Sequence, residues 1–422
     1  MVSDNYDSSE RTLAVIQRTY HASLELATLK GNDRNRGILA MAKALENSRE
    51  EILEANTLDL EMSREMAVPD LILEWLKLTP ERLQAAIQIL RRLSELSDPS
   101  LRVMNAPYQL ERSQTYCQLM PLGVIALIYE AFPELGAIAA GLCIKTGNSL
   151  ILRGSSEASH SNTAIQQALH AALEEADLPS GCLEMLHADQ GSSIKDLVTQ
   201  DQYLNLVIPY GRPSLVKQVM SCATAPVLKS AMGNCYLYWS ESGDLDMARW
   251  MIIDSHASEP DPVNAVEKVL ISQQQKPTTV NRLLSSLQEQ GFELRGDALT
   301  VEAYPDRLSL ADESEWSTSY LDKIVAFKFV EGIDRAIAWM NRYSSSHADC
   351  LVTESYHESR QFAQKIDSAL VYINTTPRFS RHPQRGDSIF LGMSNQKGHR
   401  RGLVGLETLT TLKQVVQGDR RF

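Results

Sequence analysis

Apolar residues recur at helical spacing through the first hundred residues of the chain. The segment between Arg34 and Ala55 carries such a stripe. Its members are Ile38, Leu39, Met41, Ala42, Leu45, Ile52 and Leu53. A second helix is expected to start near residue 80, because Thr79 can cap it, Pro80 fits its first turn and Glu81 suits its positive end. The pattern predicts a helical N-terminal region.

The stretch SDPSLRVMNAP at 97–107 breaks this helical pattern. Residues 108–131 then alternate between polar and apolar before becoming solidly apolar, which predicts a hairpin leading into a central strand. The longest apolar stretch, 121–131, is too short to cross a bilayer and is typical of a buried strand. We therefore expect no membrane association.

From residue 123 onward, strand-like and helix-like segments alternate. Strands are predicted at 123–129, 149–153, 182–187, 203–209 and 235–239, with helices at 136–146, 157–176 and 213–223. The rhythm resumes at 324–330, 333–342, 350–353, 356–366 and 369–373, and 406–417 reads as a terminal strand. This alternation predicts an α/β protein whose parallel sheets are covered by helices on both faces.

Composition limits the class of protein. A chain of 422 residues with 43% hydrophobic content can bury a large core in two or three domains. The net charge of −12 argues against binding nucleic acid through a basic surface. The acidic, polar N-terminus resembles no signal or transit peptide, so we expect a cytoplasmic protein.

The side chains that usually bind metals or form disulfides show no suitable spacing. The six cysteines form no C-x-x-C pair, and the nine histidines no H-x-x-x-H or H-x-x-E-H pattern. We expect free thiols and no metal site. Phosphate-binding loops of the G-x-G-x-x-G and Walker types, and the G-x-S-x-G elbow, are also missing from the sequence.

Six long motifs carry a resemblance to a known family. They read PLGVIALIYEAFPE, IKTGNSLILRGSSEA, LVIPYGRPSL, NRYSSSHADCLVTE, SALVYINTTPRF and GMSNQKGHRRGLVGLETLTTLK. In this order they resemble γ-glutamyl phosphate reductase, a member of the aldehyde dehydrogenase superfamily that catalyses the second step of proline biosynthesis. The resemblance runs from about residue 10 to the C-terminus.

The resemblance implies an aldehyde dehydrogenase-like fold in three parts. Residues 10–100 and 123–238 would form a Rossmann-type dinucleotide-binding domain, 239–385 a catalytic-type domain, and 101–122 with 386–422 an oligomerisation arm. A homo-oligomer, dimeric or larger, is expected on the same ground. If the family activity is retained, the cofactor would be NADPH.

The family's nucleophilic cysteine has no counterpart at the matching position. The family loop reads approximately P-G-V-C-N-A, whereas residues 260–265 here read PDPVNA. Val263 therefore stands where a thiolate would attack the acyl phosphate, and the neighbouring Asn264 is retained. Because valine has no lone pair and no ionisable proton, we expect no catalytic residue at this position.

Three further departures fall on the expected pocket. The family's E-A-R-P-N becomes EAFPE at 130–134, so Phe132 replaces an anion-binding arginine and Glu134 occupies the oxyanion position, where its charge would repel. The paired glycines of P-R-G-G become Gly211 and Arg212, and the arginine is expected to obstruct a pyrophosphate. Phe390 replaces a ribose-binding glutamate.

Several residues still match the cofactor segment. They are Lys145, Asn148, Arg153, Glu157 and Gly211, and Arg153 could contact the 2′-phosphate of NADPH. For the K-x-G-N part an equally good explanation is structural, because it reads as a helix-to-strand turn with Gly147 in the left-handed conformation. These positions are therefore expected to bind a cofactor weakly or vestigially.

The residues leave three hypotheses for function. The first is a catalytically impaired pseudoenzyme, kept as a structural or regulatory partner of a true reductase paralogue, of glutamate 5-kinase or of another complex. The alternative is an active NADPH-dependent glutamate-5-semialdehyde dehydrogenase of proline biosynthesis. A further alternative is a small-molecule sensor that uses the old cleft, with Arg153 and Arg212 as anion contacts.

Overall fold

The computed structural model describes residues 2–109, 113–187, 193–257, 262–383, 386–398 and 400–418. The chain divides into two compact units. The first comprises residues 1–229, 381–391 and 404–422, and the second comprises 230–380 and 392–403. Within the described ranges, no helix is both long and apolar enough to span a bilayer.

The first unit begins with five helices and contains a parallel sheet. Its helices are α1 (Val2–Leu26), α2 (Gly31–Asn47), α3 (Arg49–Glu65), α4 (Asp70–Leu76), α5 (Pro80–Glu95), α6 (Leu135–Thr146), α7 (Ser159–Glu175), α8 (Ile194–Val198) and α9 (Pro213–Cys222). Its strands are β1 (Val103–Asn105), β2 (Ser113–Pro121), β3 (Val124–Tyr129), β4 (Ser149–Arg153), β5 (Leu183–Met185), β6 (Leu206–Tyr210) and β16 (Thr410–Gly418). The predicted helix start at Thr79 is confirmed, because its side chain accepts a hydrogen bond from the Arg82 backbone N–H.

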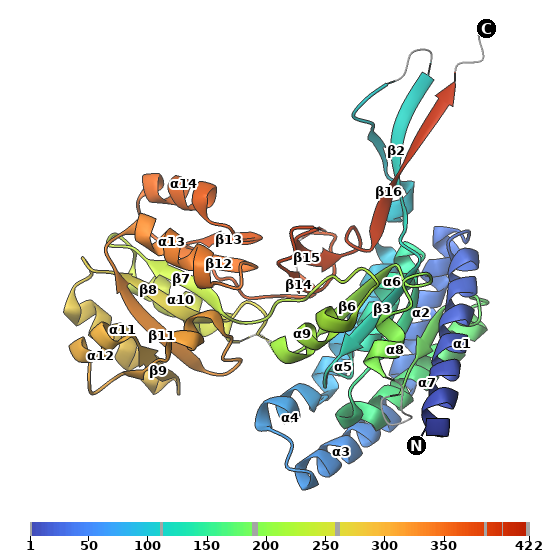
Figure 1. The fold of residues 1–422 in the computed structure, drawn as a ribbon, viewed down its shortest axis with the longest axis horizontal. Helices are drawn as coiled ribbons and strands as arrows, with labels where there is room; N and C mark the ends of the chain where they lie inside the picture. Colours follow the sequence, from blue (N-terminus) through green and yellow to red (C-terminus); the bar gives the residue numbers. More distant parts are fainter. Residues whose placement is uncertain are drawn as a thin grey trace. The chain divides into compact units, whose positions relative to one another are not determined.

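The four parallel strands run in the order β5-β4-β3-β6. One face packs on α1, α8 and α9 through a core that includes Ile16, Leu197 and Val219. On the other face α6 is buried along its whole length and contacts α2 and α5 (Figure 1). A helix that is apolar all round suits this position between other elements. The carboxyl ends of β3, β4 and β6 therefore converge at one edge.

A separate antiparallel sheet forms the predicted arm. Its strand order is β1-β2-β16, and β16 pairs with β2 from Thr410 opposite Pro121 to Gly418 opposite Ser113. In Figure 1 this ribbon extends away from the four-stranded sheet. Segments about 300 residues apart in the chain thus lie side by side. The predicted arm also included residues 392–403, which belong to the second unit, and its role in oligomerisation stays a prediction.

The second unit is built on a seven-stranded parallel sheet of order β10-β9-β11-β8-β7-β12-β13. Its strands are β7 (Cys235–Trp239), β8 (Val266–Ser272), β9 (Glu293–Gly296), β10 (Ser309–Leu310), β11 (Ile324–Val330), β12 (Ala348–Val352) and β13 (Leu370–Ile373). Its helices are α10 (Leu245–Ser255), α11 (Pro277–Glu289), α12 (Ala298–Ala303), α13 (Ile333–Tyr343) and α14 (Tyr356–Lys365). A two-stranded sheet joins β14 (Phe390–Ser394) to β15 (Gly402–Gly405).

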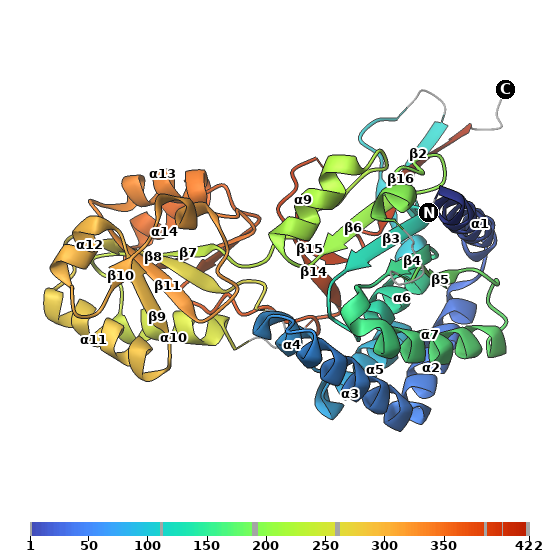
Figure 2. The ribbon, with the colours of Figure 1, turned by 60° about the horizontal axis from the view of Figure 1, so that its bottom comes forward.

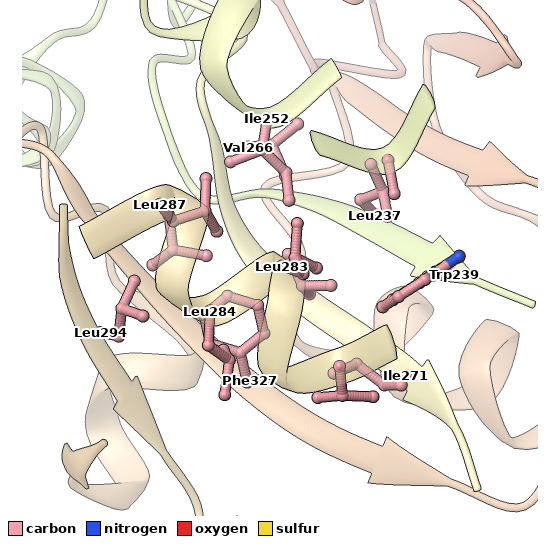
Figure 3. Close-up of a cluster of buried hydrophobic side chains, with 14 of the residues drawn as sticks. Leu237, Trp239, Ile252, Val266, Ile271, Leu283, Leu284, Leu287, Leu294 and Phe327 are labelled. Atoms are coloured by element: carbon pink, nitrogen blue, oxygen red, sulfur yellow. The ribbon is translucent and has the colours of Figure 1, made fainter. Parts of the chain in front are cut away.

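Successive side chains of each central strand point alternately to the two faces of this sheet. Figure 3 shows Leu283, Leu284 and Leu287 of α11 packed against Phe327 and Ile271. On the opposite face, α13 and α14 cover a second cluster that includes Tyr236, Leu270 and Ala326. Figure 2 shows α13 and α14 on one side of the strands and α10 and α11 on the other. Both faces of the sheet are therefore covered, as the alternation predicted.

The domain boundary differs from the predicted one. The sequence placed residues 123–238 in the first domain, whereas the compact units divide between Lys229 and Ser230. The reason is β7, which pairs with β8 and β12 in the seven-stranded sheet rather than with the four-stranded one. Its apolar run fits any central parallel strand, so hydropathy alone could not assign it to a sheet.

Candidate active site

The loop before β8 holds Val263, the position that the family resemblance assigns to the nucleophile. Val263 is 1% exposed, and its carbonyl oxygen accepts hydrogen bonds from the Gly233 N–H (3.0 Å) and from His347 Nε2 (2.8 Å). Pro260 and Asp261, the first residues of the matched stretch, lie outside the described residues. The loop therefore presents a buried hydrocarbon side chain on a backbone that is fixed from two sides.

His347 is held neutral at this loop. Burial lowers its pKa from 6.5 to about 4, although the hydrogen bond to the Val263 carbonyl acts in the opposite direction. To donate to that carbonyl, Nε2 carries the proton, so Nδ1 accepts from the Ser345 hydroxyl, 2.8 Å away. The imidazole anchors the loop and has no lone pair aimed at a substrate.

Cys235 lies next to this histidine, with Sγ 3.3 Å from His347 Nε2. Its side chain is fully buried, and burial, followed by the nearby Asp349, raises the thiol pKa well above 9. The nucleophile of acyl transfer must be a thiolate within reach of substrate. Cys235 therefore does not replace the missing thiol.

The other cysteines offer no better candidate. Burial raises the pKa of Cys143, Cys182 and Cys350, and Cys117 is also buried. Cys222 is partly exposed, but it lies on α9 and its thiol donates to the Gln218 carbonyl. Five of the six thiols are buried, and the sixth, Cys222, donates to a backbone carbonyl of its own helix.

Asn264, the retained neighbour of Val263, is also buried. Its Nδ2 donates to the Pro377 carbonyl at 2.7 Å and lies 3.5 Å from the Tyr372 hydroxyl. These bonds tie the loop to the segment that follows β13. The amide donors of Asn264 are therefore used within the second unit.

In the first unit, the substituted residues after β3 are built into the core. Phe132 is fully buried, stacks on Trp75 with ring centroids 4.7 Å apart and meets Tyr210 edge-on at 5.5 Å. Such pairs stabilise by about 0.5–1.5 kcal/mol beyond their burial. Where the family has an anion-binding arginine, this chain has an aromatic cluster.

Glu134 is neutralised by a partner that the sequence did not suggest. Both of its carboxylate oxygens lie 2.7 Å from Arg82 Nη2, and the same guanidinium donates to the carbonyls of Trp75 and Lys77. Glu134 is 5% exposed. The predicted repulsion at the oxyanion position is therefore offset by a buried ion pair.

Glu130 accepts hydrogen bonds from the loop after β6, which contains Gly211 and Arg212. Its carboxylate accepts from the Arg212 backbone N–H at 2.7 Å and from Arg212 Nε at 3.0 Å. Gly211 has φ +150°, and a Cβ there would lie 2.5 Å from Glu130 Oε2. The Arg212 guanidinium is folded onto Glu130 at the carboxyl edge of the sheet, and its predicted obstruction of a pyrophosphate stays a prediction.

Lys145 and Asn148 have protein partners at the α6–β4 turn. Lys145 Nζ donates to Asn35 Oδ1 at 2.8 Å and to the Leu96 carbonyl, and burial lowers its pKa to about 8. Asn148 Oδ1 accepts from the Gly123 N–H, and its Nδ2 donates to the Leu409 carbonyl, both at 2.8 Å. The geometry favours the structural explanation of these two residues; their role in cofactor binding stays untested.

Arg153 and Glu157 lie at the carboxyl end of β4, the edge at which parallel sheets bind ligands. Burial lowers the pKa of the Arg153 guanidinium. The binding of a dinucleotide by Arg153 and Glu157, and the effect of the Glu130–Arg212 pair on its pyrophosphate, stay predictions. Among the described residues, no cluster of histidine, cysteine and carboxylate side chains could hold a metal ion.

The partners that fill this site were beyond sequence reasoning. Arg82 is 52 residues from Glu134, and Glu130 is 82 residues from Arg212, so no local periodicity connects them. The sequence offered one signal for the Glu134 pair. Residues 132 and 134 both depart from the family motif, and the preceding helix carries Arg82. Sequence reasoning found the positions but not what pairs with them.

The two parallel sheets with their arm define an aldehyde dehydrogenase-type protein, and the family model described as "Aldehyde dehydrogenase family" matches residues 5–289. The crystal structure of γ-glutamyl phosphate reductase from Thermotoga maritima superposes with a TM-score of 0.88 at 34% identity, over 97% of this chain and 99% of that one. The fold assignment from sequence is confirmed.

Two relatives identify the family within this class. The chain is 56% identical over 421 residues to γ-glutamyl phosphate reductase 2 of Synechocystis sp., covering 100% of both. It is 40% identical to γ-glutamyl phosphate reductase of Gloeobacter violaceus, covering 96% of both. The chain belongs to the γ-glutamyl phosphate reductase family, a family of oxidoreductases.

Proposed function

We propose that this chain reduces γ-glutamyl phosphate to glutamate 5-semialdehyde, the second step of proline synthesis. The observation that carries the proposal is its similarity, over the whole length, to relatives named for that reaction. These names favour a working reductase over the silent homologue that the sequence analysis ranked first. The fold similarity to a reductase of known structure supports the same choice.

A working reductase with valine at position 263 needs a route without a thioester. NADPH supplies a hydride, which would add directly to the carbonyl carbon of the acyl phosphate. Collapse of the resulting oxyanion would break the C–O bond to phosphate, and the phosphate would leave with the electron pair. The leaving phosphate would take one proton from water, so the products would be the aldehyde, hydrogen phosphate and NADP⁺, with no acyl-enzyme.

On this proposal the chain contributes binding and orientation. Arg153 would meet the 2′-phosphate of the cofactor from the carboxyl end of β4, beside Glu157. Without nucleophilic catalysis, we expect a lower turnover than in relatives that carry a cysteine.

The second candidate is a catalytically silent homologue, and a specific observation favours it. The side chains at three family positions are committed to the protein itself, with Phe132 in an aromatic cluster, Glu134 paired with Arg82, and Arg212 paired with Glu130. Such a chain could act as a structural or regulatory partner of a true reductase, of glutamate 5-kinase or of another complex. A homo-oligomer built through the β2–β16 arm belongs to either proposal.

The third candidate, a small-molecule sensor, rests on fewer groups. It would use Arg153 and Arg212 as anion contacts, and the Glu130 carboxylate already pairs with Arg212. A ligand would have to displace this ion pair. Binding of NADPH without turnover would support this candidate.

The reverse reaction separates these functions. Purified protein is mixed with glutamate 5-semialdehyde, inorganic phosphate and NADP⁺, and NADPH formation is followed by absorbance. A working reductase gives NADPH only when phosphate is present. A protein that binds NADPH, seen by its fluorescence, yet produces none would refute the reductase, and Arg153→Ala, which should weaken binding of NADPH but spare NADH, checks the cofactor assignment.

A further inference from the structure

A pocket at the far end of the second unit's sheet lies apart from the site described above. It has a volume of about 380 Å³ and lies where β8 and β11 end and α13 follows. Val263 and Asn264 precede β8, whereas Gln273 follows it. Nine residues of extended chain separate Asn264 from Gln273, or about 30 Å at the rise of a strand. The pocket is therefore at the opposite edge of the sheet.

The topology makes this edge a crevice. The chain leaves β8 into α11 and leaves neighbouring β11 into α13. The α11 leucines pack on one face of the sheet, and the α13 residues Ala336, Ile337 and Met340 pack on the other. Adjacent parallel strands whose following helices go to opposite faces leave a gap at their carboxyl ends, where open α/β sheets bind ligands.

The lining of the pocket is basic, in contrast to the chain's net charge of −12. Arg335 and Arg342 are exposed on α13. Glu331 is 3.7 Å from Arg335 in an exposed pair, which holds the arginine only weakly. Arg342 has no ion pair among the described residues. Two guanidinium groups are thus available for an anion, and guanidinium binds phosphate or carboxylate through paired donors.

Aromatic rings form the wall beside these arginines. The Trp339 and Tyr343 rings have centroids 4.4 Å apart, and Lys328 Nζ lies 4.6 Å from the Trp339 ring centroid. The Arg342 guanidinium is 5.0 Å from the Tyr343 ring. Such rings attract planar groups by stacking and cations through their faces. Lys328, which pairs with Asp297, and Arg342 each cover one face of these rings, so a flat ligand ring would use the other face or displace a cation.

We propose that this pocket binds a mononucleotide, with its phosphate on Arg335 and Arg342 and its base against Trp339 and Tyr343. The volume supports a mononucleotide, because it is at the lower end of the range for ligand pockets. The exposed amide of Gln273, which also lines the pocket, can hydrogen-bond a base edge. The proposal is independent of the reductase function.

Titration calorimetry of the full chain with AMP tests this site. Arg342→Ala should weaken AMP binding about tenfold or more, since it removes a charge-assisted contact. Arg360→Ala is the matched control, because it removes an exposed arginine from the neighbouring helix α14 outside the pocket. We expect this control to bind AMP as the parent does, and the thermal midpoint of both variants to stay unchanged.

Three results would overturn the proposal. Absence of AMP binding at millimolar concentration is one. Equal binding by the parent and Arg342→Ala is another, because it would move the nucleotide to a different site, such as that of Arg153. The third is binding of inorganic phosphate or adenosine as tightly as AMP, since a site that uses both arginines and rings must prefer the whole nucleotide.

Discussion

The family resemblance assigns the nucleophile to position 263, where this chain has a valine. A thioester needs a sulfur atom in contact with substrate, and the thiol nearest to this loop, Cys235, is buried and firmly protonated. In the first unit, the substituted residues Phe132, Glu134 and Arg212 already have partners within the protein. We therefore predict that a single exchange at position 263 does not rebuild the family's site.

Val263→Cys should leave the rate of NADPH formation within about twofold of the parent. The position is 1% exposed and fixed by bonds to its carbonyl, so a new thiol would be as inaccessible as Cys235. The reverse-reaction assay measures this, with the unfolding midpoint as a check on folding. A large gain in rate would show that the remaining pocket is still competent for thioester chemistry.

Arg82→Ala should destabilise the protein by about 3–5 kcal/mol, because it leaves the buried Glu134 carboxylate without its partner. Arg91→Ala is the control. Its pair with Glu46 is about half exposed and should contribute less than about 1 kcal/mol. Urea unfolding of both variants gives the comparison, and equal losses would mean that Glu134 is not the buried, paired group described above.

Acid should weaken the folded state through His347. Its pKa falls from 6.5 to about 4 on folding, so the unfolded chain binds the proton first as pH drops through this window. The stability contributed by the neutral form is complete above 6.5 and is lost towards 4, by about 3 kcal/mol.

The difference between the parent and His347→Gln isolates this effect, since Gln can still donate to the Val263 carbonyl but does not titrate. Other buried groups, including His256 and Asp349, are common to both proteins. Urea unfolding across this pH range should show the parent losing more stability than the variant. Parallel curves would mean that His347 titrates normally.

At the scale of elements, the sequence predicts bounds most accurately where they depend on residues that are close together in the chain. The bounds of β4 and β7 agree with the predicted strands, and the Thr79 cap starts α5 as expected. Residues 245–310 gave no clear prediction, yet β8 and α11 form the centre of the second unit. The structure of such segments depends on strand pairing with residues that are distant in the sequence. The same kind of pairing places β7 in the seven-stranded sheet.

The α6–β4 turn is an element whose sequence allowed two explanations. Asn148 joins the start of β3 to the segment before β16 through buried hydrogen bonds, so Asn148→Ala should cost about 2–4 kcal/mol. Asn281→Ala, on the exposed surface of α11, should stay within about 0.5 kcal/mol. A stable Asn148→Ala protein with weakened NADPH binding would instead favour the cofactor explanation.

At the scale of the whole molecule, family membership and site composition point in different directions. The full-length similarity to named reductases favours activity. In contrast, Phe132, Glu134 and Arg212 contact partners within the protein, which favours a catalytically inactive site. The sequence could show which family residues had changed. It could not show that Arg82 and Glu130 pair with the replacements, because those contacts depend on the fold.

Mass spectrometry of the protein, quenched during the reverse reaction, tests whether hydride transfer occurs without an acyl-enzyme. We predict that NADPH accumulates while the protein keeps its unmodified mass. A γ-glutamyl adduct on any cysteine, removable by hydroxylamine, would contradict it and restore the thioester route. A complete lack of NADPH would contradict the reductase itself and leave the silent homologue.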